Sequence, residues 1–199
     1  ISYFTPKYID LLNNSYKIFD FSISNDFYYN LLNKKVLINP FPLSKKQFKF
    51  KSTFDILFYG QFNERRIKIL KHLNKKFDII FKENCLGNTK NELIKKCKIV
   101  INLHFYDNAC LETCRINEVL KFNKIVISEN VNIKDLATKN LYENCVIFTD
   151  VINSNLDNIK NLEDKIIYCL QNYNNLLSKF DYNKIYSHCN NCLNNNLKI

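Results

Sequence analysis

The stretch Asp55-Ile56-Leu57-Phe58-Tyr59-Gly60 decides the fold class of this 199-residue chain. A short apolar run that ends in glycine is typical of a buried β-strand followed by a sharp turn. Asn63 is a suitable helix N-cap, Glu64 suits a first helical turn, and apolar residues then recur at helical spacing up to Lys76. The stretch and its continuation therefore predict a strand, a tight turn and a helix.

The same alternation of strand and helix repeats along the chain. Further strands are predicted over 77–81, 98–105, 124–128 and 145–149, and helices over 89–96, 111–121, 133–142 and 161–177. This alternation indicates β-α-β units and a mostly parallel sheet. Right-handed crossovers make it a Rossmann-like, doubly wound parallel sheet of the α/β class. Ligands of such sheets bind at the carboxyl ends of the strands.

The first 51 residues follow a different pattern. They predict helices over 7–12 and 25–32 and strands over 17–21 and 35–38. The second strand ends at Asn39-Pro40-Phe41-Pro42, because proline stops strand pairing. A strand–helix–strand fragment of this size is too small to hold a core of its own. We therefore expect it to be a fragment of a second α/β domain.

The domain boundaries follow from these two patterns. We expect the end of an N-terminal domain over 1–45, a linker over 46–53, a nucleotide-binding domain over 54–177 and a helical tail over 178–199. The chain contains no methionine, so we expect it to start inside a longer polypeptide.

Composition excludes several classes of protein. With 46% hydrophobic residues the chain is not disordered, and no run approaches the roughly 18–20 apolar residues of a membrane span. The net charge of +10 is spread thinly, without the interleaved aromatic or arginine residues of a nucleic-acid platform. We therefore expect no nucleic-acid partner and no integral membrane contact.

The eight cysteines and the lack of a leader peptide indicate reduced thiols and a cytoplasmic location. Cys97, Cys145 and Cys169 lie within apolar runs, where a free cysteine acts as a small hydrophobic residue. Cys189 and Cys192 have the spacing of half a zinc site, but a zinc site needs four ligands and no second pair exists. We expect no metal.

Arginine and glycine are rare in this chain, and all three arginines and one of the two glycines fall within a set of four strings that resemble a known family. These strings are 58–66 (FYGQFNERR), 98–106 (KIVINLHFY), 111–118 (LETCRINE) and 126–129 (VISE). In this order they resemble the donor half of a group-1 glycosyltransferase of the GT-B fold, and 19–25 and 39–42 resemble the end of the first domain of such proteins. The resemblance implies two Rossmann-like domains with a cleft between them, a nucleotide-sugar in the second, and no obligatory metal or cofactor. The asparagine- and lysine-rich composition is also similar to that of giant-virus proteins.

The first group of candidate binding residues surrounds Gly60. A diphosphate needs backbone N–H donors and positive charge where the chain approaches closely, and Gly60 permits that approach or only makes the turn. Arg65 and Arg66 offer forked guanidinium groups to phosphate, or form surface ion pairs. Neighbours on a helix point about 100° apart, so we expect at most one of them to reach the cleft. Asn63 either contributes to binding the ligand together with these residues or only caps the helix.

The second group is a stripe on the helix over 111–121. Glu118 resembles the family glutamate that accepts hydrogen bonds from ribose hydroxyls, although an exposed helical glutamate is the alternative. The family's other glutamate stands eight residues earlier, where this chain has Cys110. Arg115 shares a helix face with Glu118 and either pairs with it or binds phosphate, and Glu112 extends the stripe.

The third group stands at strand ends. His104 is the candidate catalytic residue, with a structural histidine as the alternative, and Asn102 lies on the same strand face. Ser128 and Glu129 end the next strand, where they contact sugar or phosphates or cap a helix.

These residues predict a glycosyltransferase that moves a sugar from a nucleotide-diphosphate sugar to an acceptor glycan, lipid or protein. The alternative is a non-catalytic nucleotide- or sugar-binding module, which the cysteine at position 110 favours.

Overall fold

A computed structural model describes residues 5–22, 25–38, 49–106, 109–150 and 156–197 of the protein. The proline-containing segment 39–42 and the start of the predicted linker lie outside these residues. Within the described helices, none is long and apolar enough to cross a membrane.

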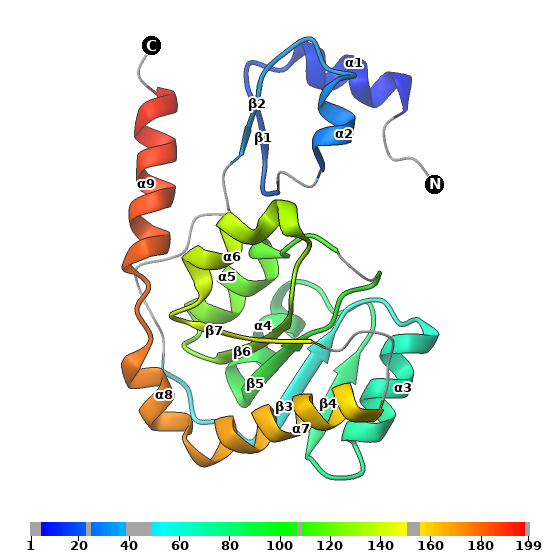
Figure 1. The fold of residues 1–199 in the computed structure, drawn as a ribbon, viewed down its shortest axis with the longest axis vertical. Coiled ribbons are helices and arrows are strands. Elements are labelled where there is room, and N and C mark those ends of the chain that lie inside the picture. Colours follow the sequence, from blue (N-terminus) through cyan, green and yellow to red (C-terminus); the bar gives the residue numbers. More distant parts are fainter. Residues whose placement is uncertain (1–4, 23–24, 39–48, 107–108, 151–155, 198–199) are drawn as a thin grey trace.

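A five-stranded parallel sheet forms the centre of the protein (Figure 1). The strands are β3 (Phe54–Tyr59), β4 (Ile79–Lys82), β5 (Cys97–Asn102), β6 (Ile125–Glu129) and β7 (Val146–Thr149). Their order across the sheet is β4-β3-β5-β6-β7, and every neighbouring pair is parallel. The chain therefore runs from β3 to one side, returns past β3, and continues outward on the other side.

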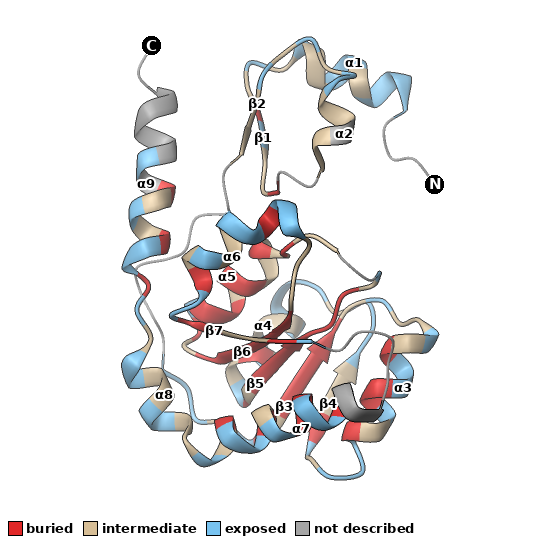
Figure 2. Ribbon diagram, viewed as in Figure 1, coloured by how far each residue is buried: buried red, intermediate tan, exposed pale blue. Residues whose placement is uncertain are grey.

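Helices cover both faces of this sheet, as the doubly wound prediction requires. On one face lie α3 (Glu64–Leu73) and α7 (Leu156–Gln171); on the other lie α4 (Gly87–Lys96), α5 (Thr113–Lys121), α6 (Leu136–Tyr142), which the short helix η2 (Ile133–Asp135) precedes, and α9 (Asn183–Leu197). Helix α8 (Tyr173–Lys179) follows α7. Figure 2 shows the buried residues concentrated in the strands and on the inner faces of these helices.

Strand β3, which lies between β4 and β5, has a nearly continuous apolar sequence because both of its faces are covered. Ile56 and Phe58 pack with α3 and α7, whereas Leu57 and Tyr59 pack with α4 and α5. Successive side chains of a strand point to opposite faces, and here both faces are covered. Strand β3 is therefore buried on both sides.

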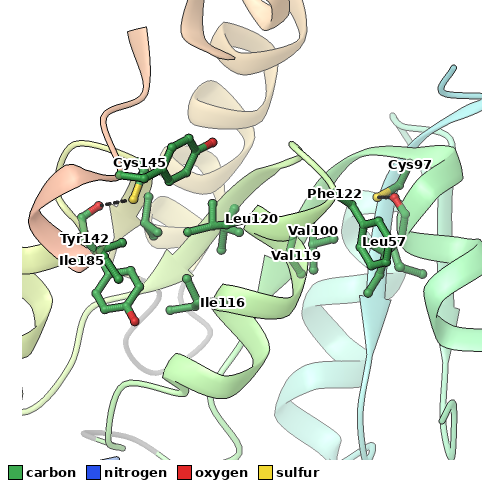
Figure 3. Close-up of a cluster of buried hydrophobic side chains, with 14 of the residues drawn as sticks. Leu57, Cys97, Val100, Ile116, Val119, Leu120, Phe122, Tyr142, Cys145 and Ile185 are labelled. Atoms are coloured by element: carbon green, nitrogen blue, oxygen red, sulfur yellow. Dashed lines mark hydrogen bonds between the residues drawn. The ribbon is translucent and has the colours of Figure 1, made fainter. Parts of the chain in front are cut away.

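Helix α9 lies in the segment predicted as a tail. It packs on the same face of the sheet as α4, α5 and α6. Its Ile185 and Cys189 are buried in the same cluster as Tyr142 and Cys145 (Figure 3 shows Ile185 beside these two). No disulfide joins two of the described cysteines, and the side chain of Cys192 lies outside the described residues.

Several predicted boundaries differ from the structure by a few residues. Strand β5 ends at Asn102 instead of 105. The carbonyl groups of 103 and 105 accept hydrogen bonds from the side chains of Arg66 and Asn63, so they do not pair with a neighbouring strand. The long helix expected over 161–177 is interrupted at Asn172, between α7 and α8. Helix α4 begins at Gly87 instead of 89, and its Glu92 pairs with Lys95.

The N-terminal residues form a small unit that contacts the main sheet domain. It contains α1 (Pro6–Asn14), β1 (Ile18–Asp20), α2 (Asp26–Tyr29) and β2 (Val36–Ile38), and β1 pairs with β2 in parallel. The Ser22 hydroxyl donates to both carboxylate oxygens of Asp135 at 2.8 Å. Lys134 Nζ lies 2.7 Å from Asp26 Oδ1. Two consecutive residues before α6 therefore tie this unit to the sheet domain.

Candidate functional site

The candidate site lies where the strand order reverses, between the carboxyl ends of β3 and β5. After β3 the chain turns to the α3 face, and after β5 it turns to the α5 face. Doubly wound sheets bind their ligands at such a switch point, because the two departing segments separate there. The three arginines of the sequence, which come from α3 and α5, meet at this point.

Gly60 makes room for two of these arginines. Its φ is +140°, and a Cβ added there would lie 3.2 Å from Arg115 Nη2 and 3.7 Å from Arg66 Nη1. The backbone N–H of Gly60 donates to the carbonyl of Lys82 within the sheet. Gly60 therefore contributes space and backbone freedom, while its own N–H is engaged.

Asn63 caps α3, as the sequence predicted, and also holds the loop after β5. Its Oδ1 accepts from the backbone N–H of Arg66 at 2.9 Å, and its Nδ2 donates to the carbonyl of Phe105 at 2.7 Å. One side chain thus fixes the start of the helix against the end of a different strand.

Arg66 is a buried clamp, only 3% exposed. Its Nε donates to His104 O at 3.2 Å, its Nη1 to Gln61 O at 2.7 Å and its Nη2 to Leu103 O at 2.5 Å. Burial, followed by the nearby Arg115 charge, lowers the pKa of Arg66 to about 10. Each of the three nitrogens of the Arg66 guanidinium therefore donates to a backbone carbonyl, so this buried side chain holds the segments after β3 and β5 together.

Arg65 reaches the same loop from the neighbouring helix position. It pairs with the Glu129 carboxylate, and its Nη1 donates to His104 O at 3.1 Å. Glu129 Oε2 also accepts from the backbone N–H of His104 at 2.5 Å. Both side chains therefore converge on the carbonyl of His104, Arg66 in a buried position and Arg65 in a partly exposed one. The expectation that at most one of them reaches the cleft stays a prediction.

Arg115 links the ends of β5 and β6 to α5. Its Nη1 donates to Asn102 Oδ1 at 2.9 Å and lies 3.3 Å from Glu112 Oε2. Asn102 Nδ2 in turn donates to Ser128 Oγ at 3.0 Å. The Nη2 group of Arg115, beside Gly60, makes no hydrogen bond to the residues that the structure describes, so a donor remains available.

Glu118 is bound differently from the sequence alternatives. Its Oε1 lies 2.7 Å from Lys90 Nζ, so of the two alternatives for Arg115 the ion pair with Glu118 is not the one that forms. Arg115 pairs with Glu112 instead, because α5 begins only at Thr113 and Glu112, at the N-cap position, lies outside it.

Sequence reasoning missed Lys90 and Tyr59. Lys90 Nζ and Arg115 Cζ lie 5.9 and 5.2 Å from the centre of the Tyr59 ring. The only sequence signal for Tyr59 was its place directly before Gly60. Lys90 gave none, because its partner Glu118 belongs to another helix.

His104 is buried beside this cluster, with only 3% of its surface exposed. Its Nε2 has no hydrogen-bond partner among the described residues, and the same holds for Tyr59 Oη. Burial and then the charges of Arg65, Arg66 and Arg115 lower the pKa of His104 to about 4. The imidazole is therefore neutral at neutral pH and is a weak base.

Among the residues that the structure describes at the site, positive charges outnumber negative ones. Three guanidinium groups stand against the carboxylates of Glu112 and Glu129, while Lys90 and Glu118 neutralise each other. A buried polar atom without a partner requires an explanation, and an anionic ligand with oxygen acceptors would satisfy both features. Among the described residues, no three His, Cys, Asp or Glu side chains are grouped as a metal site would need.

The chain is similar in sequence to two viral proteins and in fold to a bacterial protein of known structure. No protein-family model matches it. Two uncharacterized proteins of Acanthamoeba polyphaga mimivirus are 34% identical over 137 residues and 32% identical over 117 residues. These alignments cover 66% and 52% of this chain but only 46% and 38% of the viral proteins. The chain therefore spans less than half the length of these relatives.

The crystal structure of a glycosyltransferase from Rickettsia africae superposes with a TM-score of 0.54 at 14% sequence identity. The match covers 100% of this chain and 67% of that one. The chain thus shares the mixed α/β fold of that glycosyltransferase, with a five-stranded parallel sheet flanked by helices.

Proposed function

We propose that the chain is the donor-binding half of a GT-B glycosyltransferase, and that it transfers a sugar from a nucleotide-diphosphate sugar to an acceptor glycan, lipid or protein. The observation that carries this proposal is the meeting of three arginines at the switch point between β3 and β5, where Arg66 and Arg115 lie beside Gly60 and Arg65 lies beside His104 and Glu129. The shared fold with a bacterial glycosyltransferase supports it.

The diphosphate would lie against Arg115 and Arg65. Arg115 offers Nη2 at the surface of Gly60, and Arg65 lies beside the end of β6. Both are held by carboxylates, so their guanidinium groups are oriented before a ligand arrives. Preorganised charge of this kind stabilises the negative charge that develops on a leaving diphosphate.

The ribose would lie toward Glu118, on the side of α4. The resemblance assigns Glu118 to the ribose hydroxyls, and its carboxylate is accessible, with 30% of the side chain exposed. Lys90 holds one of its oxygens, so the other is left to accept hydrogen bonds from vicinal hydroxyls.

Thermal unfolding in the presence of UDP, GDP and their sugars tests the binding step. A ligand at about 100 times its Kd adds about 2.7 kcal/mol of stability, which for a chain of this size raises Tm by roughly 5–11 °C. Arg115→Met should abolish the shift. Lys98→Met is the matched control, because Lys98 forms a comparable ion pair with Asp55 at the far end of β5. No stabilisation of the wild type by any of these nucleotides contradicts the proposal.

Turnover separates an enzyme from a binding module. Cys110 stands where the family has a glutamate, and its partly buried thiol lies near Asp135 and Ser22. This observation favours the non-catalytic alternative. Hydrolysis of a nucleotide-sugar that Glu118→Ala abolishes supports the transferase, whereas nucleotide binding without turnover, also with added acceptors, supports the module.

A further inference from the structure

His104 has features that a structural histidine does not need. It is 97% buried, yet Nε2 has no hydrogen-bond partner among the described residues. A buried histidine with a purely structural role is expected to have hydrogen-bond partners for its ring nitrogens, because an unpaired buried polar atom destabilises the fold.

Side chains from other elements hydrogen-bond both backbone groups of His104. Its N–H donates to Glu129, and its carbonyl accepts from both Arg65 and Arg66. Asn63 holds the next residue, Phe105, through its carbonyl. These four side chains belong to the start of α3 and to the end of β6, so they hold the backbone of His104 relative to two sides of the switch point.

The charges around the imidazole ring indicate which kind of ligand atom could bind Nε2. The charges of Arg65, Arg66 and Arg115 act on the imidazole, and any ligand atom drawn among them is an anionic oxygen. Toward such an oxygen a neutral imidazole acts as a hydrogen-bond donor.

We propose that His104 is a donor-binding residue whose neutral imidazole donates the Nε2 hydrogen to an oxygen of the bound diphosphate. This inference rests on the proposed function and assigns a contact within it. It also separates His104 from proton transfer: burial and the three arginines keep the pKa of the ring at about 4, too low for an efficient base near neutral pH.

Nuclear magnetic resonance of protein labelled with ¹⁵N at histidine tests the contact. The sequence has only three histidines, so the His104 signals are assigned by their loss in His104→Gln. Pyrophosphate is the probe for the diphosphate. We expect a neutral ring between pH 5.5 and 7.5, and a slowly exchanging Nε2 proton that emerges when pyrophosphate is added. A ring that titrates near pH 6.5, or signals that saturating pyrophosphate leaves unchanged, overturns the proposal.

Affinity measurements on variants provide a second test. His104→Leu should weaken pyrophosphate and UDP binding by about 10- to 100-fold, the effect of losing a hydrogen bond to a charged group, while His104→Gln keeps an N–H donor and should retain most of the affinity. His72→Gln is the control: His72 contacts Glu163 of α7, away from the contacts of His104, and its substitution should leave the affinity for pyrophosphate and UDP unchanged. Equal binding by the wild type and His104→Leu overturns the contact but leaves the proposed function standing. If pyrophosphate shifts the His104 signals while no nucleotide-sugar binds, the proposed function fails and the contact stands.

Discussion

Gly60→Ala is the perturbation whose effect the structure specifies most closely. The residue has a φ of +140°, a backbone conformation that residues with a Cβ rarely adopt. The added methyl group would also lie 3.2 Å from Arg115 Nη2 and 3.7 Å from Arg66 Nη1. The substitution therefore strains the backbone and displaces the guanidinium group that we propose to bind the diphosphate.

The backbone strain sets the magnitude. A residue held in such a region costs about 1–3 kcal/mol, and the end of a flexible arginine side chain moves aside at little further cost. About 2 kcal/mol lowers the Tm of a chain of 199 residues by roughly 4–8 °C. Differential scanning calorimetry measures this decrease, and isothermal titration with pyrophosphate measures the accompanying loss of affinity.

The other glycine of the sequence provides the matched control. Gly87 has a φ of +57°, and a Cβ added there meets no atom within 4 Å. Gly87→Ala should lose about 1–2 kcal/mol through the backbone alone and leave ligand affinity unchanged. A Gly60→Ala protein that melts within about 1 °C of the wild type would refute the strain argument. Equal losses of affinity in the two variants would refute the role assigned to Gly60 at the site.

The remaining predictions concern buried polar groups. Arg66→Met should destabilise the chain by about 1–3 kcal/mol in urea unfolding, because the buried carbonyl of Leu103 loses its donor. Because the folded protein keeps His104 neutral down to about pH 4, the unfolded chain binds more protons between pH 6.5 and 4, and stability should fall by about 2–3 kcal/mol from pH 7 to 4.5; His104→Gln should remove this component. Ser22→Ala and Asp135→Asn should be non-additive by about 0.5–3 kcal/mol in a double-mutant cycle, since their hydrogen bonds join the N-terminal unit to the sheet domain.

Much of the fold was predictable because its signals are local. Apolar runs of strand length, helical spacing and an N-cap at Asn63 predicted the strands and helices of the sheet domain in their correct order. Boundaries failed where distant groups intervened. Strand β5, for example, stops at Asn102 because Arg66 and Asn63, from another helix, bind the carbonyl groups that would have continued the ladder.

The candidate site was predictable as a set of residues but not as a set of contacts. The strand ends and the rare arginines pointed to Gly60, Arg115 and His104. The partner of Glu118 could not be predicted, because Lys90 stands 28 positions away on a different helix, among many similar lysines. Likewise, no local pattern shows that Arg66 would be buried and spent on carbonyl groups.

The sequence alone determined the kind of protein this is: an α/β chain with alternating strands and helices, a glycine turn after its first buried strand, and candidate ligand groups at the strand ends. These features depend on side-chain periodicity and turn chemistry, which act over a few residues. The tertiary structure alone decided the strand order β4-β3-β5-β6-β7, which creates the switch point. It also decided the convergence of three arginines there and the burial of His104. Those outcomes depend on packing between segments far apart in the chain, where long charged side chains settle only after the backbone has placed their partners.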